Sequence, residues 1–137
     1  MVNLKKEDFK RYSKELLFLH KKNIEAHLKK DVDSLVQGVS EDFISVNNGK
    51  VNFPSIEDIR KNYSEYLENT EFSKYEDQMD PIIGFSEDGS IGWSIVKVSV
   101  GGKSKNKHDL EFTCAWITLY KRSNDKWLRF IEVSSFQ

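Results

Sequence analysis

Three polar side chains on the first predicted helix have residue types that can do acid–base or binding chemistry. His20, Asn23 and His27 lie on or beside the apolar stripe of that helix. An imidazole titrates near neutral pH, so His27 can act as a base or orient a ligand. The alternative interpretation is structural, with each histidine hydrogen-bonded or half-exposed near a helix end. The two histidines stand about 10 Å apart along the helix. This is too far for them to bind one metal ion as an i, i+4 pair does, and the sequence predicts no metal site.

Two charged residues of the last predicted strand form the second candidate set. Arg129 and Glu132 stand in an apolar context beside Phe130 and Ile131. Strict alternation along a strand puts them on opposite faces, so at most one is predicted to face a pocket. A carboxylate in an apolar cavity has a raised pKa and can serve as an acid or base, whereas arginine would select an anionic ligand. The structural alternative places one at a subunit surface and the other near a rim, paired with a neighbour.

Helices fill most of the first half of the chain and must position the histidines. The first helix is predicted from Lys6 to Lys30, with Tyr12 and Leu16 on its apolar stripe. A second helix is predicted to begin at Asp31, and either Asp31 or Asp33 can serve as its N-terminal cap. A third opens at Ser55, where Ser55 and Asp58 have the spacing of a capping box.

A period-two pattern dominates the second half and predicts a run of antiparallel strands. One short strand precedes the third helix and the others follow it. They are predicted at Phe43–Val46, Phe72–Asp77, Ile82–Phe85, Ser90–Val100, Glu111–Arg122 and Lys126–Phe136. The lysine-containing tract Gly101–His108 is predicted to be an exposed loop between two long strands.

Both faces of the long predicted strands carry bulky apolar residues. From Glu111 onward, Ile117 and Leu119 share one face, while Trp116 and Tyr120 share the other. A half-solvated sheet would show one polar face, so this sheet should be covered on both sides. The helices can cover only one face, and we therefore predict a homodimer through the outer face. The pattern leaves open which face is concave, because a one-residue shift of register exchanges them.

Composition and charge exclude several classes of protein. The 137 residues fit one domain, and 21 basic against 22 acidic residues give a net charge of −1, which argues against nucleic-acid binding by counterion release. The single cysteine, Cys114, excludes an internal disulfide and a multi-cysteine zinc site. No segment has the length and apolarity of a signal peptide or a membrane span. A cytoplasmic protein without membrane attachment is predicted, exported only if a leader has been removed.

Several short motifs resemble the nuclear-transport-factor-2-like (NTF2-like) superfamily, particularly its SnoaL-like branch, which includes polyketide cyclases. They are Ala26–Asp31 leading into Asp33–Leu35, Glu41–Val46, Thr118–Arg122, and the segment from Lys126–Trp127 to Ser135. The resemblance covers nearly the whole chain and implies a single SnoaL-like domain over residues 1–137. The implied fold is an α+β roll of cystatin-like type, in which a cone-shaped, curved antiparallel sheet wraps around N-terminal helices. Members are commonly dimeric and hold a pocket between the concave sheet and the helices.

The same resemblance implies where the candidate residues lie. Positions just before Asp31 face the interior in that family, so Asn23 and His27 are expected to point into the cone. Family cavities lie between the third helix and the sheet, which implies aromatic walls beside whichever of Arg129 and Glu132 faces inward. The aromatic candidates are Tyr63, Trp93, Trp116 and Tyr120; as aromatic residues they are also core and interface material.

Three functions remain open on these grounds. The first is a pocket protein that binds a small apolar or weakly anionic organic molecule, without a cofactor. The second is a metal-independent isomerase, cyclase or dehydratase, with His27 as the base and Asn23 or a tyrosine donating to an oxyanion. The third is a non-catalytic protein-interaction module whose cone is packed shut. A cavity of several hundred cubic ångströms with convergent polar groups favours the first two.

Overall fold

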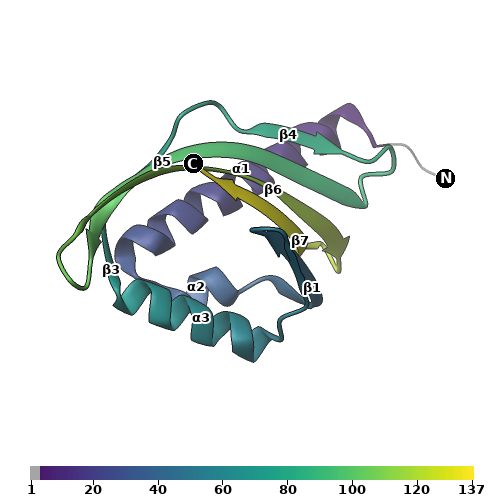
Figure 1. Cartoon of the computed structure of the whole chain (residues 1–137). Helices are drawn as coiled ribbons and strands as arrows, with labels where there is room; N and C mark the ends of the chain where they lie inside the picture. The colour runs from purple at the N-terminus through teal and green to yellow at the C-terminus, as the bar shows by residue number, and fades with distance from the viewer. Residues whose placement is uncertain (1–3) are drawn as a thin grey trace.

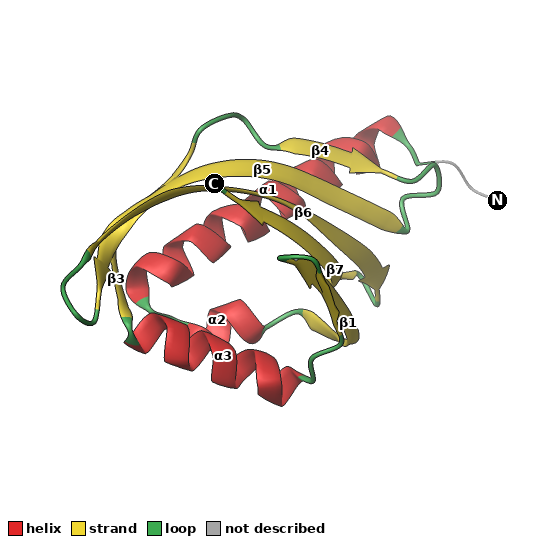
Figure 2. Ribbon diagram, viewed as in Figure 1, coloured by secondary structure: helices red, strands yellow, loops and turns green. Residues whose placement is uncertain are grey.

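A computed structural model describes residues 4–137 of the chain. The helices are α1 (Lys6–Lys29), α2 (Val32–Val36) and α3 (Ile56–Glu68). The strands are β1 (Val39–Asn47), β2 (Lys50–Asn52), β3 (Thr70–Asp77), β4 (Ile82–Phe85), β5 (Ile91–Ser104), β6 (Asp109–Ser123) and β7 (Lys126–Phe136). Figures 1 and 2 show α1 lying along the concave side of the bent sheet, with α2 and α3 closing one end. The predicted α+β roll around N-terminal helices is confirmed.

The helix ends follow the local signals of the sequence. Lys30 ends α1 in the left-handed conformation, with φ of 58°, and its N–H donates to the carbonyl of His27. The side chain of Asp31 accepts from the N–H of Ser34 and caps α2. Ser55 and Asp58 form the predicted capping box at the start of α3. These caps set the sharp turns that fold α2 and α3 back toward α1.

The sheet has the strand order β2-β1-β7-β6-β5-β3, with β4 also paired to β5. All neighbouring pairs are antiparallel except β1 and β7, which are parallel. The parallel pair was not predicted. It joins the first strand of the chain to the last, so their relative direction depends on the path of every element between them.

A β-bulge in β7 corrects one prediction from the sequence. Leu119 of β6 pairs with Ile131, but the next residue, Tyr120, pairs with Arg129. Phe130 is therefore an extra residue in β7, and the alternation of faces changes there. Arg129 and Glu132 consequently lie on the same, concave face. The prediction that they project to opposite faces was wrong, because it assumed unbroken period-two geometry.

The strands β5 and β6 are longer than predicted. Gly101 to Lys103 pair with Glu111 to Asp109, so the predicted loop Gly101–His108 shrinks to residues 105–108. Gly102 is needed for close packing of strands, because a Cβ at that position would collide with the carbonyl oxygen of Glu71 in β3.

The burial of side chains shows which residues of the sheet face its concave side. On β6 the inward side chains are Phe112, Cys114, Trp116, Thr118 and Tyr120. Cys114 is buried, as predicted, and joins a core cluster with Ala26 of α1 and Val98 of β5. No helix within residues 4–137 is long and apolar enough to cross a membrane.

Candidate functional site

The hollow between α1 and the concave sheet contains two cavities. The larger has a volume of about 740 Å³ and lies between the N-terminal two-thirds of α1, the α2–β1 connection and strands β6 and β7. The smaller has a volume of about 450 Å³ and lies between the C-terminal part of α1, α3 and the other end of the sheet. Asn23 and Trp116 line both cavities. They mark the place where the hollow is divided.

His27 lies in a cage of aromatic rings at the smaller cavity. Its ring is stacked on Tyr75 with centroids 4.6 Å apart, and it meets Tyr63, Tyr66 and Phe72 edge-on. Its Nδ1 donates to the backbone carbonyl of Asn23 at 2.8 Å, which leaves Nε2 as an acceptor. His27 is 6% exposed. Burial lowers its pKa to about 4, and the nearby charge of Arg129 lowers it as well, against the Asn23 hydrogen bond. The imidazole is therefore neutral at pH 7.

Arg129 and Glu132 form a partly buried ion pair between the cavities. Nη1 of Arg129 lies 3.8 Å from Oε2 of Glu132, and the side chains are 12% and 26% exposed. The guanidinium also donates to the carbonyl oxygen of Leu35. Burial raises the pKa of Glu132, and Arg129 opposes this rise. Arg129 lines the larger cavity and Glu132 the smaller one, so one bulge supplies both cavities with a charged group.

The tyrosines of the smaller cavity are neutral hydrogen-bonding groups. Burial raises the pKa of Tyr63, with a further rise from Glu132, and it raises the pKa of Tyr66 to about 12. Burial also raises the pKa of Tyr75 well above its usual value. The thiol of Cys114 is affected in the same way, with burial raising its pKa to about 11. None of these groups is a ready nucleophile at pH 7.

A histidine–carboxylate pair lies at the wall of the larger cavity. His20 projects from α1, and its Nε2 lies 2.7 Å from Oδ1 of Asp77 at the end of β3. The His20 side chain is almost fully buried, whereas Asp77 is 31% exposed. A carboxylate on one ring nitrogen fixes the orientation of the imidazole and leaves Nδ1 for another partner. Because His20 also lines the cavity, this pair has the geometry of an oriented general base.

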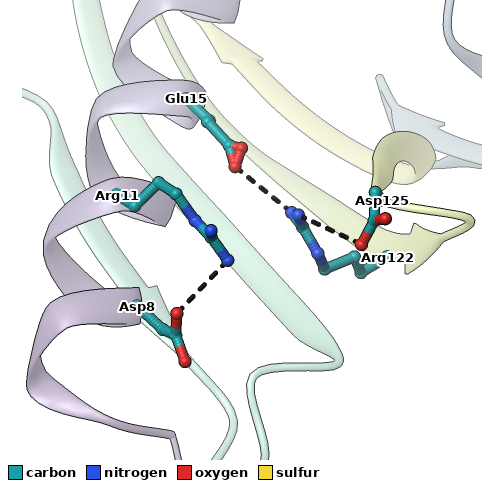
Figure 3. A network of polar contacts seen from close by, with 5 residues as sticks. All are labelled: Asp8, Arg11, Glu15, Arg122 and Asp125. Atoms are coloured by element: carbon teal, nitrogen blue, oxygen red, sulfur yellow. Dashed lines mark hydrogen bonds and ion pairs between the residues drawn. The ribbon is translucent and has the colours of Figure 1, made fainter.

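A network of ion pairs ties α1 to the β6–β7 hairpin beside the larger cavity. Arg122 pairs with both Glu15 and Asp125 (Figure 3), at distances of 3.3 Å and 3.8 Å. Its guanidinium lies over the Tyr12 ring, 4.1 Å from the ring centroid. Arg11 pairs with Asp8 on the same helix. These contacts hold the hairpin against α1.

The structure brings together most of the residues proposed from the sequence. The smaller cavity collects Asn23, His27, Tyr63, Trp116 and Glu132. The larger cavity collects Asn23, Trp116, Tyr120 and Arg129.

Trp93 lies apart from this group. It is on the convex face of the sheet, where its indole covers Gly84 of β4, and it lines neither cavity.

Sequence patterns did not predict some of the contacts in the hollow. Asp77 is separated from His20 by 57 positions, and nothing in the sequence links them. Tyr66 was expected on the inner side of its helix and among the aromatic residues that could wall the pocket, but its edge-on contact with His27 was not predicted. Within residues 4–137, no three His, Cys, Asp or Glu side chains are grouped as metal ligands would be.

Comparisons with known proteins identify the fold. No family model matches the chain. No curated protein shows significant sequence similarity to it. Among solved structures, it is similar to an NTF2-like protein from Cytophaga hutchinsonii, with 18% identity, a TM-score of 0.71, and coverage of 96% of this chain and 98% of that chain. It is also similar to a protein with a cystatin-like fold from Caulobacter vibrioides, with 8% identity, a TM-score of 0.72, and coverage of 91% and 89%. A third similar structure is LinA, with 13% identity, a TM-score of 0.76, and coverage of 95% and 90%. The chain therefore has the fold of the NTF2-like superfamily, as its motifs predicted.

Proposed function

We propose that the chain is a SnoaL-like pocket protein that binds a small organic molecule between α1 and the concave sheet. The observation that carries this proposal is the larger cavity of about 740 Å³, which has the volume typical of small-molecule sites. Leu19 and Trp116 give it apolar walls, and Asn23, Thr118 and Arg129 add polar groups to its lining. An interaction module with a filled cone would have no such space.

Native mass spectrometry of the protein as purified tests this proposal. Ser94 lies in the lining of the larger cavity, so Ser94→Leu fills part of it. Ser135 is exposed and lies on the outer face of β7, which makes Ser135→Leu a matched control. We expect a bound small molecule in the wild type and in the control, and its loss from Ser94→Leu while the fold is retained by circular dichroism. Equal retention by both variants would place the molecule elsewhere and refute the proposal.

A second candidate function is metal-independent acid–base catalysis in the same hollow. The His20–Asp77 pair favours it, since an imidazole oriented by a carboxylate at a cavity wall is a common general base. His27, the base proposed from the sequence, has a pKa of about 4, which makes it a weak base and a better hydrogen-bond acceptor. Within this proposal, His20 removes the proton, and Asn23 donates to the oxyanion that forms.

A pair of variants separates the two histidines once a turnover assay exists. His20→Gln and Asp77→Asn should each abolish turnover, because each removes the oriented base. His27→Phe should lower it less, since the cage keeps its shape. If His27→Phe is the more damaging variant, the base has been assigned to the wrong residue.

We also propose that the molecule is a homodimer through the convex face of the sheet. Ile82, Ile95, Ile117, Val133 and Val46 pair in register across five neighbouring strands. Paired residues share a face, so they form one continuous β-branched row. Ile117 is 37% and Val133 is 38% exposed in the single chain. A contiguous apolar band of this kind is typical of a subunit interface.

A further inference from the structure

Positive charge gathers at the mouth of the larger cavity. Lys14, Phe18 and Lys22 follow one another at i, i+4 and i+8 along α1, so they lie on one face of the helix. Lys126 faces the same cavity from the β6–β7 hairpin. All four side chains are exposed, with Phe18 at 63%. The mouth thus combines three cations with an apolar ring.

The other charged residues that line this cavity already have partners. Arg11 pairs with Asp8, Arg129 with Glu132, and the one lining carboxylate, Glu15, with Arg122 (Figure 3). Lys14, Lys22 and Lys126 form no ion pair with any residue in the range 4–137. Since the whole chain has a net charge of −1, the excess of cations at this mouth is a local property and not a general one.

The smaller cavity lacks the positive charge of the larger one. None of the residues that line it is lysine or arginine, and its one charged group is Glu132. Four aromatic rings surround its neutral histidine. An anionic group is therefore disfavoured at this end of the hollow and favoured at the other.

We infer that the larger cavity takes an amphipathic organic anion, with its acid group among Lys14, Lys22 and Lys126 and its apolar body against Phe18, Leu19 and Trp116. This inference rests on the proposed small-molecule function and narrows it. It fixes the charge of the ligand and its direction in the hollow. The lysines are exposed, so their attraction is modest and is weakened by salt.

Two fluorescent probes of nearly equal shape test the inference. 8-Anilinonaphthalene-1-sulfonate carries one negative charge, and N-phenyl-1-naphthylamine is its uncharged counterpart. Both are titrated into the wild-type protein at ionic strengths of about 0.02 M and 0.2 M, between which the Debye length falls from about 20 Å to about 7 Å. We expect the sulfonate to bind about tenfold more tightly than the neutral probe at low salt, since each of the three lysines should contribute about twofold. Most of that difference should disappear at high salt.

Two triple variants with the same change of net charge locate the effect. Lys14→Gln/Lys22→Gln/Lys126→Gln should remove the preference for the sulfonate and leave the affinity for the neutral probe unchanged. The control Lys103→Gln/Lys105→Gln/Lys107→Gln alters the end of β5 and the β5–β6 loop, close to the smaller cavity, and should keep the preference.

Three outcomes would overturn the inference. Equal affinity for the two probes would refute the inferred preference for an anionic ligand, but it would not contradict the proposed small-molecule function. Loss of the preference in the loop variant places the acid group at the smaller cavity. Failure of both probes to bind overturns the proposed function together with this inference.

Discussion

The buried imidazole of His27 gives a pH dependence of stability that can be worked out from the structure. Its pKa is about 4 in the folded chain and about 6.5 when unfolded. Above pH 6.5 the residue is neutral in both states and does not affect stability. As the pH falls below 6.5, the unfolded chain binds a proton that the folded chain does not bind until about pH 4. The free energy of unfolding must therefore decrease over this interval.

The size of the effect follows from the difference of pKa. One pKa unit corresponds to about 1.4 kcal/mol, so the full contribution is about 3.4 kcal/mol at pH values below both pKa values. Between pH 7 and pH 5 the expected loss from His27 alone is about 2 kcal/mol. His27→Phe places a ring of similar size among the same aromatic neighbours and removes this titration.

Urea denaturation at pH 7 and at pH 5 measures the effect in each protein. The loss of stability on acidification should be about 2 kcal/mol smaller in His27→Phe than in the wild type. His108→Gln removes an exposed histidine of the β5–β6 loop and should behave as the wild type does. The C2 proton of His27 should also keep the NMR shift of a neutral imidazole at pH 5. An equal loss in all three proteins would refute the assignment of His27 as a neutral, buried base.

Three further perturbations test other parts of the structure. Arg129→Met should destabilise the chain by about 3 kcal/mol in urea denaturation, because it leaves Glu132 without its counter-charge. In this variant the pKa of Glu132 rises further above its unfolded value, so the free energy of unfolding should fall as pH rises above about 4.5. The double variant Arg129→Met/Glu132→Gln should recover part of the lost stability. A larger loss of stability in the double variant would contradict the pairing. Gly84→Ala should lower the melting temperature by steric conflict with the Trp93 indole, yet leave probe binding unchanged; weaker binding would mean that Trp93 contributes to the site after all. Ile117→Glu should shift the protein from dimer to monomer in analytical ultracentrifugation, whereas Lys61→Glu, at an exposed position of α3 on the other side of the sheet, should not. A monomeric wild type would refute the proposed interface.

Local signals in the sequence predicted the elements that local contacts determine. The capping box at Ser55 and the cap at Asp31 depend only on residues three positions away. The last strand, Lys126–Phe136, has the predicted bounds because its apolar pattern continues from the turn to the end of the sheet. The same patterns predicted the order of the elements, and the resemblance of the short motifs to the NTF2-like superfamily added the expectation of a cone-shaped sheet around the N-terminal helices.

What the sequence did not predict depends on contacts between distant segments. Apolar residues occupy both faces of β6, so only packing against α1 reveals that Trp116 faces inward. The bulge at Phe130 has no glycine or other local signal. The contact of His20 with Asp77 requires β3 to end beside the middle of α1. These three features determine which side chains line the hollow, which explains why the fold was easier to predict than the site.

The bulge has a physical consequence for any ligand in the hollow. With unbroken alternation, only one of Arg129 and Glu132 would face inward, and a single buried charge is costly unless it is paired. The extra residue places both inside, where they neutralise each other at the boundary between the two cavities. The only cations without an ion pair along the larger cavity, among residues 4–137, are then the lysines at its mouth. A ligand held there by its acid group would extend its apolar body past Asn23 and His20 toward the division at Trp116. The arrangement of charges therefore sets the direction in which a substrate would meet the His20–Asp77 pair.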